Sequence, residues 1–440
     1  MELKLPPIVD EVFDKLTKAG FQAFLVGGSV RDLILARSTH DWDFTTNATP
    51  AQIQEVFGEK SFYNNSFGTV GVNLEEGETV QITPFRKEAK YSDHRHPDKV
   101  EWAETLEEDL ARRELTINSL AYSDKLIDPF GGQNDLKNKI IRAVGNPTDR
   151  FNEDALRMLR AIRFATQLGF LIENETFLAI KQNAVLLQKI SGERIRDEVE
   201  KIFSSDFPAD GVRLLSNSGL LQYILPELVR GIGVSQKGTH HADDVFTHSL
   251  KALQFCQNKN WVVRLATLLH DVGKPATFKE RNGKATFYNH ETIGGGIARD
   301  IANRLHFTKE DREKLYMLVR WHMFTVSEFI TDAAVRRFIR RVGAENTTDM
   351  LDLRTADRVG SGVKPTSWRH EEFKRRIIKV QQHIPSVNDL AIDGNDVMQI
   401  LGIGPGPQIG RILNILFEEI TEDPSKNNRE YLITKIKTLT

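Results

Sequence analysis

The sequence predicts an α+β protein, with a mixed sheet backed by helices in residues 1–140 and helices alone in the rest of the chain. Short runs rich in β-branched and aromatic residues, such as Phe21–Val26 and Glu78–Thr83, occur in the first of these regions, the only one where we expect a sheet. Beyond it, apolar residues recur at intervals of three and four, as from Leu156 to Ala165, which indicates amphipathic helices. Because the chain has 440 residues, it exceeds the usual size of one domain, and we expect several.

Composition places the chain among ordinary folded proteins. Hydrophobic residues make up 40% and charged residues 27%, which excludes collagen-like, disordered and disulfide-rich classes. The single cysteine, Cys256, cannot form an internal disulfide or a multi-cysteine zinc site, which fits a reducing cytosol. No apolar run approaches the ~18 residues of a membrane span and the first residues lack a signal-peptide pattern, so we expect a soluble cytoplasmic protein with no membrane partner.

The charge balance limits how the chain could bind nucleic acid. A formal net charge of −2 gives no global attraction to a polyanion, so any such site must be a local basic patch. The densest basic cluster contains Arg142, Arg150, Arg157, Arg160 and Arg163. Solvated helix faces would explain any one cluster taken alone. The sequence carries no indication of oligomeric state.

A glycine pair follows the first expected strand. Gly27 and Gly28 stand between the apolar run that ends at Val26 and the start of an expected helix. Glycine lets the backbone approach a ligand closely, and the start of a helix offers unpaired N–H groups to phosphate. An ordinary turn would carry the same pair, so the glycines point to a ligand only together with the residues that follow them.

Two aspartates come shortly after this turn. Asp41 and Asp43 lie two apart on an expected strand, where a period of two points both carboxylates to one face. Two close anions repel each other, and Mg²⁺ held by carboxylates and substrate phosphates relieves that repulsion in nucleotide chemistry. We therefore expect Asp41 and Asp43 to be the catalytic ligands of Mg²⁺. A solvent-facing Asp-x-Asp on an edge strand is the alternative.

These residues resemble a known family. Gly27–Asp32 with Asp41 and Asp43 is similar to the nucleotidyltransferase superfamily of DNA polymerase β, in particular its class II branch of tRNA nucleotidyltransferases and bacterial poly(A) polymerases. Arg112–Asn118 resembles the Arg-Arg-Asp-Phe-Thr-Ile-Asn segment of that branch, which implies contacts to the ribose and triphosphate of a nucleotide. The ordered resemblance covers about the first 205 residues and implies a polymerase β-like head.

A further motif concerns the choice of nucleotide. Glu153–Arg157 is similar to the family's Glu-Asp-x-x-Arg templating motif, and Gly192–Glu198 resembles its helix-turn motif in the neck. Residues three apart on a helix share a face, so Asp154 and Arg157 could read one base together; a surface ion pair is the alternative. A carboxylate accepts from the exocyclic amine of cytosine or adenine, while a guanidinium donates to ring acceptors. The nucleotide-binding residues that we expect are Gly27, Gly28, Arg31, Arg112, Arg113, Asn118, Asp154, Arg157, Arg160 and Arg163.

A charged run between the head motifs predicts a mobile loop, because Arg86–Pro97 has no apolar face. In the resembled family, this flexible loop is implied to help change specificity from CTP to ATP, and enzymes that add only the two cytidines lack it. The loop residues that we single out are Arg86, Tyr91, Asp93 and Arg95. Phe67–Val70 also looks more like the tRNA-specific branch than the poly(A) polymerase branch.

Two residues depart from the family's pattern. Glu114 stands where the family usually has Asp, a change that keeps the charge but can shift the ribose contact. Gln81 stands where many relatives have Glu, a residue that resembles the third carboxylate of the superfamily. We therefore expect catalysis with two carboxylates in this chain.

A second constellation lies in the helical region. His270 and Asp271 stand where Gly273 and Pro275 indicate the end of a helix. Histidines with carboxylates suit Zn, Mn, Fe, Ni or Co, which lower the pKa of a bound water for attack on phosphate. The candidate metal ligands are His248, His270, Asp271, His290, His322 and Asp357. The segments around them resemble the HD phosphohydrolase superfamily over about residues 241–360, which implies a metal-dependent phosphoesterase; a structural unit with ordinary hydrogen-bonded histidines is the alternative.

Taken together, the sequence predicts four domains and one leading function. We expect a nucleotidyltransferase head in residues 1–140, a helical neck and body for nucleotide selection and RNA binding in 141–235, an HD domain in 236–362 and a helical, tRNA-contacting tail in 363–440. The resemblance implies template-independent addition of CCA to tRNA from CTP and ATP, with release of pyrophosphate. The alternatives are an A-adding enzyme, a poly(A) polymerase, an HD phosphohydrolase whose head binds RNA, and a catalytically silent RNA-binding protein.

Overall fold

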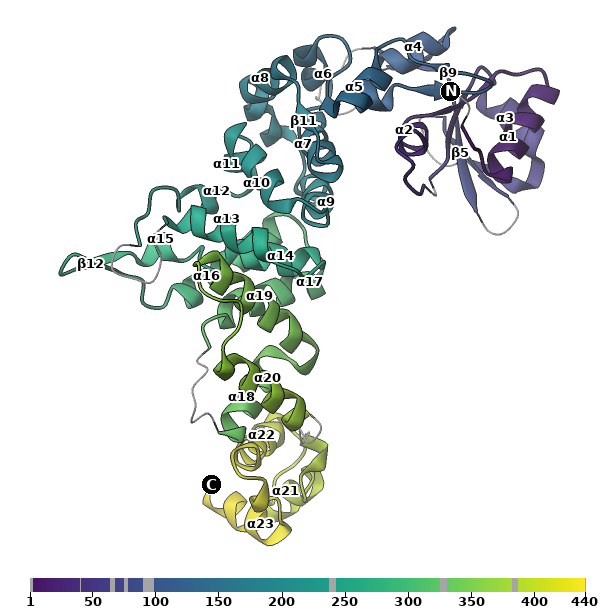
Figure 1. Ribbon diagram of the computed structural model, residues 1–440. Helices are drawn as coiled ribbons and strands as arrows, with labels where there is room; N and C mark the ends of the chain where they lie inside the picture. The colour runs from purple at the N-terminus through teal and green to yellow at the C-terminus, as the bar shows by residue number, and fades with distance from the viewer. Residues whose placement is uncertain are drawn as a thin grey trace. The chain divides into compact units, whose positions relative to one another are not determined.

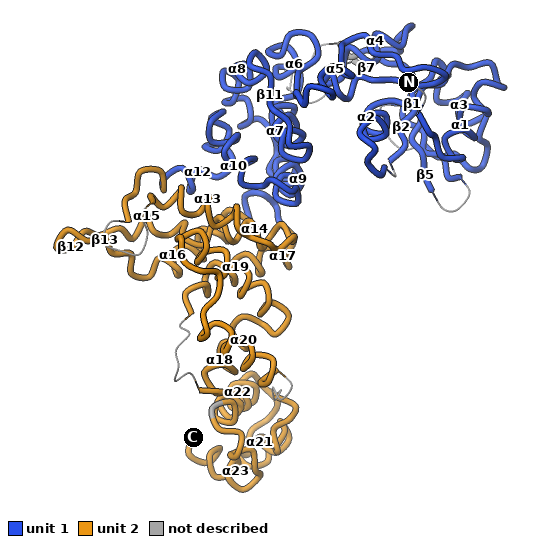
Figure 2. Tube along the Cα trace, in the orientation of Figure 1, with its two compact units in different colours: residues 1–230, 303–307 blue, residues 231–302, 308–440 orange. Residues whose placement is uncertain are grey.

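The computed structural model describes residues 3–39, 41–63, 68–74, 78–89, 99–236, 243–324, 331–381 and 387–439. The chain divides into two compact units, shown in different colours in Figure 2. Unit 1 consists of residues 1–230 and 303–307, and unit 2 of residues 231–302 and 308–440. Each unit is described by itself below.

Unit 1 begins with a mixed sheet of seven strands in the order β3-β4-β5-β2-β1-β8-β9. The pair β2–β5 is parallel, and the other neighbours are antiparallel. The strands are β1 (Ala23–Val26), β2 (Asp43–Thr46), β3 (Ser61–Tyr63), β4 (Val70–Asn73), β5 (Thr79–Pro84), β8 (Ala121–Tyr122) and β9 (Leu126–Ile127). This sheet, followed by helices, confirms the predicted α+β class.

Helices α1 (Pro7–Lys18) and α3 (Pro50–Phe57) pack against this sheet (Figure 1). Helix α1 contacts β1, and α3 contacts β3, β4 and β5. In α1, Val9, Val12 and Leu16 are buried, at the spacing of three and four that places them on one helix face. The apolar stripe of α1 therefore supplies part of the core beneath the central strands.

The remainder of unit 1 is mostly helical, and its centre is α7 (Leu156–Leu168), which packs against α9 and α10. The other helices and 3₁₀ turns are α2 (Gly28–Ile34), η1 (Gly58–Lys60), α4 (Leu106–Ala111), η3 (Thr116–Asn118), α5 (Gly132–Asn138), α6 (Pro147–Glu153), α8 (Asn174–Asn183), η4 (Ala184–Lys189), α9 (Gly192–Phe203), α10 (Pro208–Asn217), α11 (Leu221–Ile224) and α12 (Pro226–Val229).

In its described residues, unit 2 is mainly helical and contains one short hairpin. Helix α13 packs against α14 and α19, while α21, α22 and α23 share a separate core that includes Val397, Leu416 and Leu432. Its helices and 3₁₀ turns are α13 (Val245–Phe255), α14 (Trp261–Leu269), α15 (Lys274–Thr277), α16 (His290–Arg304, whose last residues belong to unit 1), α17 (Lys309–Trp321), α18 (Asp332–Val342), η5 (Ala344–Asn346), α19 (Thr347–Gly360), α20 (Trp368–Gln381), η6 (Val387–Asp389), α21 (Gly394–Leu401), α22 (Pro407–Glu422), η7 (Pro424–Lys426) and α23 (Arg429–Thr438).

Part of the predicted mobile loop is a strand. Arg86–Ala89 forms β6, which pairs antiparallel with β7 (Lys99–Trp102). The prediction of a loop from Arg86 onward was therefore wrong for these residues, because backbone hydrogen bonds hold a two-stranded ribbon whatever the polarity of its side chains. Tyr91, Asp93 and Arg95 lie outside the described residues.

The expectation that strands occur only in the first 140 residues was also wrong. The two-residue strands β10 (Ile140–Ile141) and β11 (Leu171–Ile172) pair in parallel, and they are too short to show a period of two. A hairpin joins β12 (Lys279–Arg281) to β13 (Lys284–Thr286) through Asn282-Gly283. Both turn residues have positive φ, at 51° and 72°, as a two-residue type I′ turn requires, so the Asn-Gly dipeptide was an available signal. Across the described part of the chain, no helix is long and apolar enough to cross a bilayer.

Candidate active site and metal cluster

The glycine turn joins β1 to α2, as the sequence predicted. Gly27 has φ +76°, a conformation that L side chains rarely adopt. A Cβ atom at Gly27 would lie 2.9 Å from Arg113 Nη1, so the Arg113 guanidinium lies against the turn. The absence of a side chain at Gly27 thus allows the Arg113 guanidinium to lie beside the start of α2.

The two aspartates lie close to this turn. Asp43 is the first residue of β2, whereas Asp41 precedes the strand and is exposed. The prediction that strand periodicity aligns the pair was therefore wrong, although Asp41 still acts on Asp43 through its charge. Burial and the Asp41 carboxylate raise the pKa of Asp43 to about 6, while Arg113 opposes the shift. Two mutually repelling carboxylates are a donor set that fits a hard divalent cation.

Gln81 lies directly beside this pair. In the parallel ladder of β2 and β5, Asp43 is the Cα partner of Gln81. The Gln81 N–H donates to the Trp42 carbonyl oxygen at 3.0 Å, which fixes the register at the strand start. Partners in a parallel pair point to the same face, so a neutral amide neighbours Asp43.

A buried carboxylate that the sequence analysis missed holds the two neighbouring arginines. Asp109 in α4 is fully buried and accepts from Arg112 Nε at 3.1 Å, Arg112 Nη2 at 2.9 Å and Arg113 Nη2 at 3.3 Å. Burial alone would raise the pKa of Asp109, but these guanidinium groups outweigh it and lower the pKa. The spacing of three and four residues on a helix could have indicated the ion pairs.

A chain of hydrogen bonds links the head to α7. Arg31 Nη1 donates to Asn118 Oδ1 at 2.6 Å, and Asn118 Nδ2 donates to Glu114 Oε1 at 3.2 Å. Arg160 Nη2 completes the chain by donating to Glu114 Oε1 at 2.7 Å. Burial opposes ionisation of Glu114, yet Arg160 prevails and lowers the pKa of Glu114 to about 2. Glu114 thus joins three of the predicted nucleotide-binding residues, Arg31, Asn118 and Arg160.

Asp154 lies between helices rather than within one. Its backbone is extended, at φ −137° and ψ 108°, between α6 and α7, so the helix-face argument for Asp154 and Arg157 was wrong. The Leu156 N–H donates to Asp154 Oδ1 at 3.0 Å, and Arg194 Nη2 donates to Asp154 Oδ2 at 2.7 Å. Arg157, at the start of α7, pairs instead with Glu153. Arg194 is therefore a site residue. The sequence analysis included it only within the Gly192–Glu198 motif and did not single it out.

Arg163 lies deeper, inside the helical part of unit 1. Its Nε is 2.7 Å from Glu198 Oε2, and its guanidinium carbon is 4.1 Å from the centroid of the Phe164 ring. Burial lowers the pKa of Arg163, with Glu198 opposing the shift. Arg163 therefore pairs with Glu198 of α9. Arg31 of the head also contacts the Phe164 ring, with its guanidinium carbon 4.9 Å from the ring centroid.

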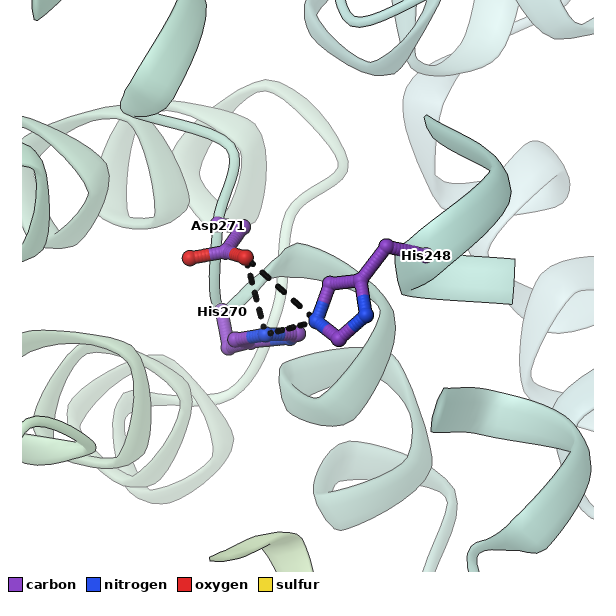
Figure 3. A group of neighbouring side chains, drawn as sticks. All are labelled: His248, His270 and Asp271. Atoms are coloured by element: carbon purple, nitrogen blue, oxygen red, sulfur yellow. Dashed lines mark hydrogen bonds and ion pairs between the residues drawn. The ribbon is translucent and has the colours of Figure 1, made fainter. Parts of the chain in front are cut away.

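The histidines and aspartates of unit 2 form one buried cluster. Asp271 belongs to two groups of potential metal ligands, one with His248 and His270 and the other with His290 and His322. Figure 3 shows the first group, whose three side chains meet from α13 and from the end of α14. Asp271 Oδ2 lies 3.5 Å from His248 Nε2 and 3.1 Å from His270 Nε2, while Asp271 Oδ1 lies 3.3 Å from His290 Nε2. Asp271 could therefore bridge two ions.

Three imidazole rings are oriented by backbone carbonyl groups. His270 Nδ1 lies 2.7 Å from the Thr267 oxygen, His290 Nδ1 lies 2.8 Å from that of Phe287, and His322 Nδ1 lies 2.8 Å from that of Val319. A carbonyl oxygen only accepts, so each Nδ1 carries a proton, and Nε2 is the ring atom that each histidine directs toward the cluster. This is the arrangement that metal-binding histidines use.

The sixth predicted ligand and a missed lysine complete the cluster. Asp357 Oδ1 lies 3.2 Å from His248 Nε2, and Lys274 Nζ lies 2.6 Å from Asp271 Oδ2. Burial opposes charge on Asp271, yet His270 and Lys274 hold its pKa well below the usual range. Burial alone would lower the pKa of His270, but Asp271 and Asp357 raise it to about 10. A bound cation would take the place of the proton that now balances these carboxylates.

Family comparisons match this arrangement along the chain. The model described as "Poly A polymerase head domain" matches residues 23–142, and "Probable RNA and SrmB- binding site of polymerase A" matches 169–231. The "HD domain" matches 245–360, and "tRNA nucleotidyltransferase domain 2 putative" matches 320–436. The fold and the sites therefore define a nucleotidyltransferase that carries an HD domain.

Individual relatives narrow the family. The CCA-adding enzyme of Ligilactobacillus salivarius is 35% identical over 97% of this chain and 95% of its own length. The A-adding tRNA nucleotidyltransferase of Deinococcus radiodurans is 34% identical over 90% of this chain and 91% of its own length. The crystal structure of the Bacillus stearothermophilus CCA-adding enzyme in complex with CTP aligns with a TM-score of 0.73 and 27% identity, covering 99% of this chain and 98% of that one. The chain belongs to the class II tRNA nucleotidyltransferase family, which confirms the resemblance read from its motifs.

Proposed function

We propose that this protein adds C, C and A in turn to the 3′ end of tRNA, using CTP and ATP and releasing pyrophosphate. The observation that carries the proposal is the pair Asp41 and Asp43 beside the Gly27 turn, in a chain that aligns over nearly its whole length with CCA-adding enzymes. The reaction joins the terminal tRNA hydroxyl oxygen to the α-phosphorus of the nucleotide and breaks the bond to the pyrophosphate oxygen.

Asp41 and Asp43 are the residues that would hold the cation. Mg²⁺, when bound, would supply charge neutralisation at the attacking and leaving oxygens. Around it, Arg112 and Arg113 are held by Asp109, so their guanidinium groups are positioned for triphosphate oxygens without reorganisation during the reaction. Phosphoryl transfer requires little covalent chemistry from the protein, and positioning of this kind is its main contribution.

Nucleotide choice is assigned to the junction of α6 and α7. Asp154 presents a carboxylate that can accept from the exocyclic amine of cytosine or adenine, and Arg194 orients it through their 2.7 Å contact. Arg157 forms an ion pair with Glu153 in the same segment, which orients its guanidinium group. Both bases that CCA addition requires carry that amine, whereas uracil and guanine carry an acceptor oxygen at the corresponding position.

An A-adding enzyme is the second candidate for the transferase, because the Deinococcus radiodurans relative with that name aligns over most of the chain. The test uses purified protein, Mg²⁺, and labelled CTP and ATP with two tRNAs, one ending at the discriminator base and one ending in CC. Addition of C, C and A to the first supports our proposal, whereas incorporation on the CC-ended tRNA alone supports the A-adding alternative. Unlimited A tails on either substrate would identify a poly(A) polymerase. Asp41→Ala should abolish every incorporation.

For unit 2 we propose a metal-dependent phosphohydrolase function. The supporting observation is the two groups of histidines around Asp271, in each of which the ligand atoms lie within 4.8 Å of one another, an arrangement that suits Zn, Mn, Fe, Ni or Co. Release of phosphate from nucleotides by the wild-type protein, assayed with each of these metals in turn, tests the proposal. The substrates of the transferase proposed above, tRNA and nucleoside triphosphates, are cytoplasmic. We therefore also propose that the protein works in the cytoplasm.

A further inference from the structure

A pocket in unit 2 has no role in the functions proposed so far. It measures about 570 Å³ and lies where α19 meets the start of α20. The lining residues that matter here are Phe324, Arg354, Arg358, Trp368, Arg369 and His370. Among the described residues that line it, three are arginines and none is acidic, so the pocket favours an anion.

A buried imidazole nitrogen in this pocket lacks a partner. His370 is 3% exposed, and its Nε2 makes no hydrogen bond within the described part of the chain. Its backbone N–H is satisfied by Ser367 Oγ at 3.3 Å. Burial of a polar atom without a hydrogen bond is unfavourable. The Nε2 atom is closed to solvent, so His370 forms part of the pocket wall without opening this nitrogen to the pocket.

The arginines suit a phosphate group. Arg354 Nη1 is 2.8 Å from Asp357 Oδ2, so one arginine touches both the pocket and a predicted ligand of the metal cluster. Arg358 Nη2 donates to the Lys364 carbonyl oxygen at 3.2 Å. This acceptor is neutral, so the contact does not compensate the guanidinium charge. Guanidinium groups bind phosphate oxygens in pairs and remain charged at every physiological pH.

Aromatic side chains add a flat surface to this basic site. Trp368 is 61% exposed and lies beside Arg369, whose guanidinium carbon is 5.6 Å from the Trp368 ring centroid. Phe324 also lines the pocket, and its ring centroid is 6.0 Å from the guanidinium carbon of Arg354. Nucleobases stack on such rings without sequence preference.

We propose that this pocket binds a nucleoside monophosphate, with its phosphate on the arginines and its base against Trp368. A volume of about 570 Å³ lies in the range of small-molecule sites, which favours a small ligand that enters the pocket over a tRNA backbone that passes across its mouth. Use of the pocket as a substrate site rests on the phosphohydrolase function proposed above, because Arg354 connects it to Asp357. Binding itself needs neither turnover nor metal.

The test measures AMP binding to the full-length protein by calorimetry in EDTA, so that hydrolysis cannot occur. Adenosine and inorganic phosphate are the comparison ligands. Trp368→Ala and Arg369→Gln each remove one element of the pocket from an exposed position, and each should weaken AMP binding about tenfold, as expected for a stacked base or a charged hydrogen bond. Arg375→Gln, also on α20, is the matched control, since its side chain is 77% exposed and pairs with Glu372.

The outcomes separate the alternatives. The site is supported if AMP binds more tightly than adenosine or phosphate, if both pocket variants bind AMP more weakly, and if Arg375→Gln is unchanged. Any AMP bound by the head would be bound equally by the wild type and the three variants. Equal AMP affinity in every protein overturns it. Loss of tRNA affinity in Arg369→Gln with AMP binding intact would assign the pocket to the RNA surface and also overturn it. Failure of phosphate release with AMP binding retained would count against the phosphohydrolase alone.

Discussion

Three carboxylates around the nucleotide site lie in opposite electrostatic environments. Arginines surround Asp109 and Glu114 and lower the pKa of both, whereas burial and Asp41 raise the pKa of Asp43 to about 6. Asp109 and Glu114 are thus already neutralised by the protein, and Asp43 is not. A buried acid whose charge the protein leaves uncompensated is what a cation-binding site requires in its metal-free state.

The raised pKa of Asp43 predicts a pH-dependent stability effect. A carboxyl group with a raised folded-state pKa destabilises the fold above about pH 6, and this cost disappears below its unfolded pKa. Asp43→Asn should therefore raise the free energy of unfolding at pH 8 by up to about 3 kcal/mol, with no gain near pH 3.5. Calorimetric unfolding in EDTA measures this difference. Equal stability of the two proteins at pH 8 would contradict it.

Asp154 gives a prediction about nucleotide choice. Asp154→Ala removes the carboxylate that Arg194 orients, so discrimination of CTP and ATP against UTP and GTP should fall about tenfold or more. Single-turnover incorporation with each nucleotide measures the ratios. Asp210→Ala is the control, because its side chain is 60% exposed and pairs only locally with Arg213. Unchanged ratios in Asp154→Ala would show that the Asp154 carboxylate does not take part in recognition of the base.

Among the elements, the turn at Gly273, which caps α15, and the start of α16 approach unusually closely. A Cβ atom at Gly273 would lie 2.1 Å from the His290 carbonyl oxygen and 2.6 Å from the Gly294 N. Backbone atoms of α16 cannot give way as a flexible side chain can. The closeness allowed by Gly273 is what brings His290 to the Asp271 carboxylate, so this glycine acts on the metal cluster through packing.

Gly273→Ala should therefore disturb both packing and metal binding in unit 2. We expect a loss of about 1–3 kcal/mol of unfolding free energy, typical of overpacking, together with weaker Co²⁺ binding seen in its visible spectrum. Gly296→Ala in α16 is the matched control, because a Cβ atom there meets nothing within 4 Å. If both variants bound Co²⁺ like the wild type, the close approach would have no bearing on the cluster.

Some elements were predictable and others were not. Helix α7 followed from its apolar spacing, and β1, the Gly27 turn and α2 followed from the order of apolar run, glycine pair and helix start. The β6–β7 ribbon was missed because the sequence of β6 is almost entirely charged, while the hydrogen bonds of the ribbon join backbone atoms. The β12–β13 hairpin was missed although Asn282-Gly283 carried the signal for it.

For the whole molecule, the two candidate metal sites belong to different units. Asp41 and Asp43 lie in unit 1, and the histidine cluster is built entirely from residues of unit 2. Each unit also has its own core. Because mutations without shared partners act independently, changes at one site should leave the chemistry of the other intact.

His270→Ala tests that independence. The substitution should spare nucleotide addition to tRNA but abolish phosphate release, because it removes one ligand of the cluster. Asp41→Ala should do the reverse, losing addition while retaining phosphate release. Both activities are measured on each protein in parallel. Phosphate release at the wild-type rate in His270→Ala would refute the assignment of the cluster as its site.

The sequence alone determined the α+β class, the glycine turn, the family and the residue types of both candidate sites, because these depend on local spacing and on motifs read in order. Only the tertiary structure decided that Gln81 neighbours Asp43, that Arg194 holds Asp154, and that Asp271 is shared by two groups of histidines. The unpartnered nitrogen of His370 likewise emerged only there. Such contacts join residues far apart in the chain, and strand register and helix packing fix them, which spacing along a sequence does not specify.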